Sequence, residues 1–212
     1  TCALDIGEQM LISGAEIGRV EDSVKRICKA YNAERIDVFT ITSSIVATIE
    51  GSDGKKITQT HRITKYQTDL AKLHRLNGLS RQICDSKPDL LYVENELEDI
   101  KRTKQYSLVF QCLACAAIAG AFTIFFGGSG IDGLVSLVVG AVVRVVVYFS
   151  KDKTQVNMIF ANFVCSFVAC LLAFASVSLG FGHAADKIII GNIMLLIPGV
   201  ALTNSIRDMI SG

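Results

Sequence analysis

The hydrophobic pattern of the first hundred residues changes its period twice. Apolar residues recur at helical spacing over residues 2–12. Ser13 and Glu16 then have the spacing of a capping box, which predicts a second helix from this point to about Tyr31. After that helix the period becomes two, and β-branched residues become frequent. Three short antiparallel strands are therefore predicted, over residues 36–42, 44–50 and 55–63.

Helical spacing returns after the strands. The apolar residues of segment 69–84 recur at helical positions, and Pro88 is placed to open a further helix that runs towards Lys104. Residues 1–104 are thus predicted to form a soluble α+β domain in the order α-α-β-β-β-α-α. A segment of this length can bury a core of its own.

From residue 105 onwards, long apolar stretches replace the periodic pattern. A helix needs about 20 apolar residues to cross the hydrocarbon of a bilayer. Residues 105–212 are therefore predicted to form an all-α transmembrane domain whose spans are joined by short loops. The four predicted spans are residues 105–126, 133–149, 155–181 and 188–206.

The charged residues are divided in the same way. The chain has 212 residues, 21 basic and 20 acidic side chains and a formal net charge of +1, yet only nine charged side chains lie after residue 104. The basic residues that flank the predicted spans gather on one side, because Lys187 alone lies on the other. The positive-inside rule then predicts a cytoplasmic location for residues 1–104. The basic residues on that side are Lys101, Arg102, Lys104, Lys151, Lys153 and Arg207.

Small residues recur every four positions in three of the predicted spans, which favours close packing of helices in lipid. The rows are Cys112, Ala116 and Gly120; Ser136, Gly140 and Arg144; and Ala161, Cys165, Ala169 and Ala173. The second row places Arg144 on a face that meets protein. A charge in a bilayer costs at least about 2.5 kcal/mol. Arg144 is thus either a structural residue, snorkelling or paired with a carboxylate such as Asp208, or a fixed cation for an anionic substrate group.

The last predicted span carries most of the candidate functional residues. Pro198 lacks an N–H and its ring crowds the carbonyl of Met194, so the helix is expected to kink or break at Pro198 and Gly199. Many transporters bind substrate at such breaks, whereas buried Asn and Thr can also simply tie helices together. The predicted pathway residues are Arg144, Asn192, Pro198, Gly199, Thr203, Asn204, Arg207 and Asp208, with Asp132 as a helix cap or an outer vestibule residue.

Other kinds of chemistry are not indicated. Cys112 and Cys115 have the spacing of a metal or redox pair, but they lie in an apolar helix without a nearby His, Asp or Glu. His61 is predicted to share the exposed face of the third strand with Thr58 and Thr60, without a ligand partner. No phosphate-binding glycine loop is present, and the mixed charges of the first half offer no nucleic-acid surface. No metal, cofactor or enzymatic function is therefore predicted.

Five ordered segments carry a further signal. They are residues 3–23 (ALDIGEQMLISGAEIGRVEDS), 36–42 (IDVFTIT), 76–81 (LNGLSR), 125–132 (FFGGSGID) and 197–208 (IPGVALTNSIRD). Together they resemble blocks of the threonine/serine exporter family (ThrE), over essentially the whole chain. The resemblance implies a bacterial inner-membrane secondary exporter of small hydrophilic metabolites, which are threonine and serine in the fused members of the family.

The resemblance leaves alternatives for the substrate and the partners. Succinate is the substrate of the split type of this family, in which a YjjP-like subunit works with a small YjjB-like membrane partner. A function of another class is a membrane-anchored sensor or scaffold. The chain lacks an initiating Met, and the fifth span of the family is missing after residue 212, so the natural protein is expected to be longer. The expected partners are a small amino acid or dicarboxylate, the lipid bilayer, and a second membrane subunit or further copies of the chain.

Overall fold

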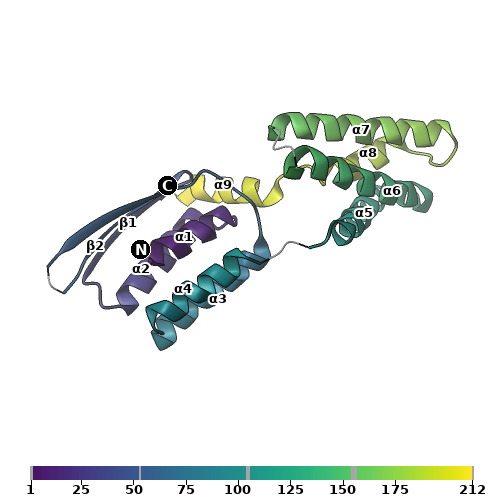
Figure 1. The fold of residues 1–212 in the computed structure, drawn as a ribbon. Coiled ribbons are helices and arrows are strands. Elements are labelled where there is room, and N and C mark those ends of the chain that lie inside the picture. Colours follow the sequence, from purple (N-terminus) through teal and green to yellow (C-terminus); the bar gives the residue numbers. More distant parts are fainter. Residues whose placement is uncertain (1, 53, 104–105, 154–156, 212) are drawn as a thin grey trace. The chain divides into compact units, whose positions relative to one another are not determined.

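The computed structural model describes residues 2–52, 54–103, 106–153 and 157–211, which form two compact units (Figure 1). One unit comprises the residues up to 104 together with those from 199 onwards, and the other comprises residues 105–198. The predicted succession of a small three-stranded sheet with helices and then a mostly helical part is confirmed.

The first unit has three layers: a sheet, a pair of helices on one of its faces, and a second pair of helices beyond them (Figure 1). Strands β1, β2 and β3 are antiparallel in that order, and helices α1 and α2 cover the sheet. The elements are α1 (Cys2–Ile12), α2 (Ile17–Ala30), β1 (Arg35–Ile41), β2 (Ser44–Glu50), β3 (Lys56–Arg62), α3 (Leu70–Ser86) and α4 (Leu90–Lys101).

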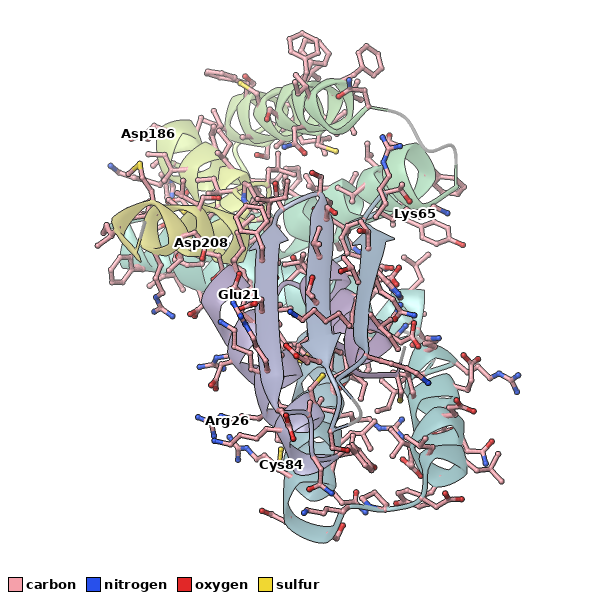
Figure 2. All side chains as sticks on the ribbon, turned by 90° about the vertical axis from the view of Figure 1, so that its left-hand side faces the viewer. Glu21, Arg26, Lys65, Cys84, Asp186 and Asp208 are labelled. Atoms are coloured by element: carbon pink, nitrogen blue, oxygen red, sulfur yellow. The ribbon has the colours of Figure 1, made fainter. Side chains whose placement is uncertain are left out.

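The core of this unit lies between the layers, and every layer contributes to it. Burying one aliphatic side chain contributes about 1.5–3 kcal/mol. A polar contact adds to the join between α2 and the sheet, because the Glu21 carboxylate accepts the backbone N–H of Thr40 on β1 at 2.8 Å (Figure 2 labels Glu21). The fully buried side chains include Leu4, Ile6, Met10, Val20, Val24, Ile45, Leu76 and Ile83.

The capping box predicted at Ser13 and Glu16 is wrong. Helix α2 begins at Ile17, and its N-cap Glu16 makes no side-chain capping hydrogen bond. Ser13 is buried, and Gly14 has a φ of +95°, so the chain turns sharply before the helix starts. The carboxylate of Glu16 instead forms an ion pair with Arg207.

His61 also lies elsewhere than predicted. Successive side chains of a strand point to opposite faces of the sheet, so His61 does not share a face with Thr58 and Thr60. The hydroxyl of Thr58 lies 2.9 Å from that of Thr48 on the outer face of the sheet. His61 faces α1 on the other side, and 19% of its side chain is exposed.

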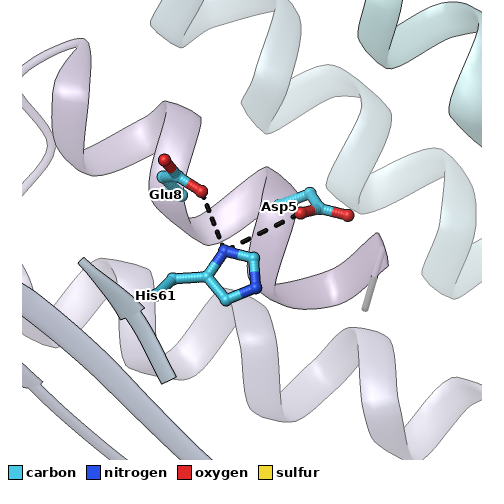
Figure 3. A group of neighbouring side chains, drawn as sticks. All are labelled: Asp5, Glu8 and His61. Carbon is cyan, nitrogen blue, oxygen red and sulfur yellow. Dashed lines mark hydrogen bonds and ion pairs between the residues drawn. The ribbon is translucent and has the colours of Figure 1, made fainter. Parts of the chain in front are cut away.

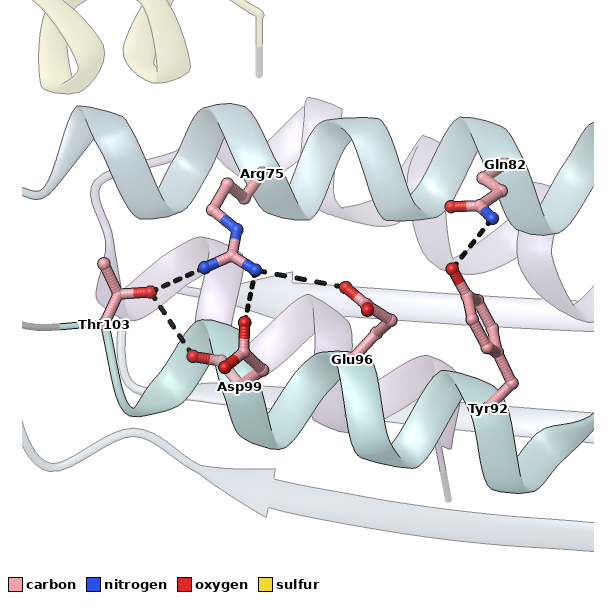
Figure 4. A network of polar contacts seen from close by, with 6 residues as sticks. All are labelled: Arg75, Gln82, Tyr92, Glu96, Asp99 and Thr103. Carbon is pink, nitrogen blue, oxygen red and sulfur yellow. Dashed lines mark hydrogen bonds and ion pairs between the residues drawn. The ribbon is translucent and has the colours of Figure 1, made fainter.

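Helices α3 and α4 are joined by a polar network around Arg75 (Figure 4). The Arg75 guanidinium donates to Asp99 at 2.7 Å and to the Thr103 hydroxyl at 2.9 Å. Its side chain is 39% exposed, so these ion pairs contribute at most about 1 kcal/mol. The buried apolar side chains of the two helices therefore account for most of the stability of this contact.

The second unit consists of α5 (Leu108–Phe125), α6 (Gly130–Val147), the π-helical turn η1 (Tyr148–Lys153), α7 (Met158–Ser178) and α8 (Ala185–Ile193). Three helical stretches are long and apolar enough to cross a membrane, which by length and composition confirms the first three predicted spans. These stretches are Leu108–Phe125, Gly130–Ser150 and Ile159–Ser178. Gln105 and Gln155, the predicted first residues of two spans, lie outside the described residues.

Small residues bring the helices of this unit close together. A Cβ atom on Gly140 of α6 would lie 2.7 Å from the Cβ of Ala119 and 3.0 Å from the carbonyl oxygen of Cys115, both on α5. The predicted small-residue row of α7 is fully buried. Close approach of backbones through small residues is the usual basis of helix packing in lipid. That row comprises Ala161, Cys165, Ala169 and Ala173.

The fourth predicted span is not one helix. The break expected at Pro198 and Gly199 is present, and non-helical residues 194–198 separate α8, of nine residues, from α9 (Gly199–Ser211), of 13 residues. Nine helical residues extend about 14 Å, and the hydrocarbon core is about 30 Å thick. Helix α9 moreover belongs to the first unit. The described part of the chain thus has three helices of spanning length rather than four.

Candidate functional site

One face of α6 carries four residues at four-residue spacing: Asp132, Ser136, Gly140 and Arg144. Residues i and i+4 lie on the same face of a helix. Asp132 and Arg144 are twelve positions apart, or about 18 Å along the helix. Each of the four meets another part of the second unit, and we call this set of four the polar seam.

Asn192 of α8 is the centre of a buried hydrogen-bond network on the polar seam. Its Nδ2 donates to Ser136 Oγ at 2.7 Å and to the carbonyl oxygen of Ile188 at 2.9 Å. Ser136 Oγ lies 2.7 Å from Thr123 Oγ1, which donates to the carbonyl oxygen of Ala119 at 2.9 Å. The three polar side chains are fully buried. They join α5, α6 and α8.

One hydrogen-bond acceptor of this network has no donor among the described residues. Asn192 Oδ1 is buried and has no hydrogen-bond partner among the described residues. Gly140 lies beside it, at a position where a Cβ atom would come within 3.3 Å of Oδ1. A buried polar atom without a partner costs about 1–3 kcal/mol. Such atoms are found where a ligand, a water molecule or a functional state completes the hydrogen bonding.

Asp132 holds the start of α6 and the loop before α8 together. Its Oδ2 accepts from the backbone N–H and the hydroxyl of Ser129, at 2.9 and 2.7 Å, and its backbone N–H donates to Ser129 Oγ at 3.2 Å, which completes the capping box of α6. Its Oδ1 accepts from the backbone N–H groups of His183 and Ala184, at 2.7 and 3.1 Å. Only 1% of Asp132 is exposed. Its carboxylate therefore fixes the position at which α8 begins. Because Asn192 belongs to α8, the carboxylate also helps to position Asn192.

Arg144 lies near the other end of the polar seam and is half-buried. Its Nε donates to Gln111 Oε1 of α5 at 2.8 Å, and its Nη2 contacts the same oxygen. The Gln111 amide thus orients the guanidinium within the second unit. The sequence analysis did not single out Gln111.

Two other predicted residues attach α9 to the rest of the first unit. Asn204 Nδ2 donates to the carbonyl oxygen of Gly14 at 2.9 Å, and Arg207 pairs with Glu16. Both acceptors lie in the turn before α2. Asn204 and Arg207 therefore belong to a different unit from Asn192, Asp132 and Arg144.

The remaining candidates have local roles in the described residues. Thr203 Oγ1 donates to the carbonyl oxygen of Gly199 in its own helix at 2.8 Å. Asp208 is half-buried in a small cavity of about 170 Å³ that it shares with Tyr66 of the first unit. Pro198 ends the break, and a Cβ atom on Gly199 would meet no atom within 4 Å.

The hydrogen bond from Asn204 can be tested by hydrogen exchange. We expect Asn204→Ala to increase the exchange rates of the α9 amides about fivefold, because one half-buried hydrogen bond contributes about 1 kcal/mol. The matched control is Thr203→Ala, which removes a hydroxyl that bonds only within its own helix. Mass spectrometry of peptides from residues 199–211 measures the effect. Equal rates in both variants and the unaltered chain would show that Asn204 does not attach α9.

Cysteine chemistry is disfavoured in the first unit. All seven cysteines of the chain are free thiols. Burial raises the pKa of the thiols of Cys2, Cys28 and Cys84, which keeps them protonated at neutral pH. The thiolate is the form that attacks an electrophile or binds a metal. In the second unit the groove of about 520 Å³ between α6 and α7 is almost wholly apolar.

Comparison with known proteins adds a family and one relative. The family model of ThrE, described as "Putative threonine/serine exporter", matches residues 1–212. The chain is similar to the threonine/serine exporter of Corynebacterium glutamicum, with 24% identity over 217 residues. The aligned region covers 99% of this chain and 44% of that protein, so the chain spans less than half of the relative's length. No solved structure matches the chain.

Proposed function

The chain belongs to the threonine/serine exporter family, and from this membership we propose that it forms part of a membrane exporter of small hydroxylated amino acids. The three helices of spanning length and the similarity to an exporter assign the chain to a membrane. Threonine and serine are the proposed substrates, after the printed name of the relative.

The observation that carries the proposal is the unpaired oxygen of Asn192 in the second unit. An amino acid that crosses an apolar medium must exchange its hydration for protein groups, because an unpaired polar group there costs several kcal/mol. The ammonium and the side-chain hydroxyl of threonine are donors, and Asn192 Oδ1 is an acceptor without a donor in the described part of the chain. We propose that Asn192 accepts one of these groups and that Arg144 balances the substrate carboxylate.

The break between α8 and α9 supports a pathway at this end of the unit. Residues 194–198 are not helical, and backbone carbonyl groups freed by a break can bind a polar solute. Pro198 and Gly199 are therefore proposed to line the route. Thr203, Asn204, Arg207 and Asp208 are proposed to act where α9 joins the first unit.

The topology and the partners are part of the same proposal. The positive-inside rule supports a cytoplasmic first unit, and the three helices of spanning length support a multi-pass second unit in a bacterial inner membrane. Because the chain spans less than half of its relative, the complete exporter is proposed to need the remaining part of such a protein. A small YjjB-like subunit is proposed to supply that part, and further copies of this chain are proposed as additional partners.

Efflux measurements test the proposal. Cells that lack this protein are supplied with the complete exporter, loaded with labelled threonine or, in a parallel experiment, labelled succinate, and followed for loss of label. We expect Asn192→Ala to slow efflux about five- to tenfold, because one buried hydrogen bond of about 1–1.4 kcal/mol is lost from the bound substrate. The matched control is Ser176→Ala, which removes a hydroxyl that bonds only within α7. Membrane abundance is measured for each variant.

The possible outcomes separate the alternatives. Unchanged efflux with Asn192→Ala at normal abundance would contradict the role of this residue. Loss of labelled succinate instead of threonine would favour the dicarboxylate exporter. No difference in efflux of either solute between cells with and without the protein would favour a membrane-anchored sensor or scaffold.

A further inference from the structure

Three ligand groups from two elements of the first unit meet at one point (Figure 3). Asp5 and Glu8 are three positions apart on α1 and point to the same side of the helix, and His61 reaches them from β3. His61 Nδ1 lies 2.8 Å from Glu8 Oε2 and 3.7 Å from Asp5 Oδ1. The three ligand atoms all lie within 4.8 Å of one another.

We propose that Asp5, Glu8 and His61 bind a divalent first-row transition-metal ion. Metal–ligand distances of about 2.0–2.2 Å put the ligand atoms about 3.0–3.4 Å apart in octahedral or tetrahedral sites. The two measured distances of 2.8 and 3.7 Å lie on either side of that range. Rotations of the side chains would bring the three ligand atoms, which all lie within 4.8 Å of one another, into that range.

The charges of the cluster favour a cation. Within the described residues, neither Asp5 nor Glu8 forms an ion pair with a Lys or Arg side chain. The side chains are 35% and 28% exposed, so the two carboxylates are partly shielded from water. A divalent ion would balance both negative charges at once.

The ligand set also favours one class of ion. Mg²⁺ and Ca²⁺ prefer sites made of oxygen ligands alone, and thiolate-rich sites select softer ions. Two carboxylates with one imidazole suit Mn²⁺, Fe²⁺ or Zn²⁺, with water in the open positions. The ion would connect α1 to β3, a strand that contributes no buried side chain to the core of the unit.

Mn²⁺ is the probe for this site, because it prefers oxygen and nitrogen ligands to the free thiols of the chain. The complete chain in detergent, freed of metal with a chelator, is titrated while electron paramagnetic resonance measures unbound Mn²⁺. We expect one bound ion per chain. Removing partners of metal ligands typically costs 10–100-fold in affinity, so losing a ligand itself in Glu8→Gln or His61→Ala should cost more than about tenfold.

Two further variants make the test specific. His74→Ala changes an exposed histidine of α3 and should bind Mn²⁺ as the unaltered chain does. His61→Asp supplies an oxygen ligand and should retain more affinity than His61→Ala. Glu8→Gln preserves the size of the side chain and an acceptor for His61, which keeps the fold. No binding by the unaltered chain, or equal affinities in Glu8→Gln and His74→Ala, would overturn the proposal.

Discussion

Gly191→Ala is expected to destabilise the second unit by about 3 kcal/mol or more. A Cβ atom at this position of α8 would lie 2.8 Å from the backbone nitrogen of Thr123 and 2.9 Å from the carbonyl oxygen of Ala119. Both obstacles are backbone atoms of α5, so a change of rotamer cannot relieve the overlap. Overpacking costs about 1–3 kcal/mol where side chains can yield, and more where they cannot.

The consequence extends to the buried network next to Gly191. If α8 moves away from α5, Asn192 Nδ2 can no longer keep its 2.7 Å contact with Ser136, whose hydroxyl contacts Thr123. We therefore expect the midpoint of heat denaturation in detergent to fall by roughly 10 °C. Efflux should be lost together with stability.

Gly130→Ala is the matched control for this substitution. Gly130 is the first residue of α6 in the same unit, and a Cβ atom there would meet no atom within 4 Å. Its denaturation midpoint should stay within 1–2 °C of the unaltered chain, because surface substitutions usually change stability by less than about 0.5 kcal/mol. A Gly191→Ala midpoint as high as that of Gly130→Ala would show that α5 and α8 are not in close contact.

Most of the fold could be predicted because its elements follow simple periods. Strand β2 has the predicted bounds, Ser44–Glu50, and helix α1 has the predicted bounds, Cys2–Ile12. Hydropathy alone identified the three helices that are long and apolar enough to cross a membrane. Their apolar faces are exposed to the surroundings, as expected for side chains that meet lipid.

The fourth predicted span stays a prediction, because hydropathy does not show that its residues form two helices instead of one. Residues 188–206 have the apolar content of a span. One helix nevertheless ends before Pro198 and another, amphipathic helix begins after it. Asn204 and Asp208 are four positions apart and form the half-buried side of α9, whose hydrogen bond and ion pair join it to the first unit. Hydropathy summed over a window of residues cannot distinguish such an amphipathic helix from the end of a membrane span.

Candidate site residues were partly predictable for a similar reason. The four-residue spacing of Ser136, Gly140 and Arg144 identified three of the four residues of the polar seam, because helical periodicity depends on local sequence alone. The contribution of Thr123 was missed, since it depends on how α5 packs against α6 and α8. The cluster at His61 was missed because Asp5 and Glu8 come from a helix more than fifty positions away.

Asp132→Ala is expected to cost more than about 3 kcal/mol. The carboxylate accepts four hydrogen bonds, two from Ser129 and one each from His183 and Ala184, and it is 1% exposed. Hydrogen bonds to a charged group contribute about 1.5–3 kcal/mol, and the alanine would leave the donors without an acceptor. Asp132→Asn should cost less, because one carbonyl oxygen can still accept from the loop while the amide faces Ser129.

The loss of stability in Asp132→Ala should be greatest near the loop before α8, because Asp132 sets the position at which α8 begins. We expect faster hydrogen exchange at residues 181–186 in Asp132→Ala and, because α8 carries Asn192, slower efflux as well. Asp186→Ala is the matched control: that carboxylate is 65% exposed and pairs only with the neighbouring Lys187 in the described residues. Exposed pairs contribute at most about 1 kcal/mol, so this control should keep both its exchange pattern and its efflux. If Asp132→Ala behaved like Asp186→Ala, the connection between α6 and α8 would not depend on this carboxylate, and the alignment of Ser136 with Asn192 would have to come from the packing of Gly140 and Gly191 alone.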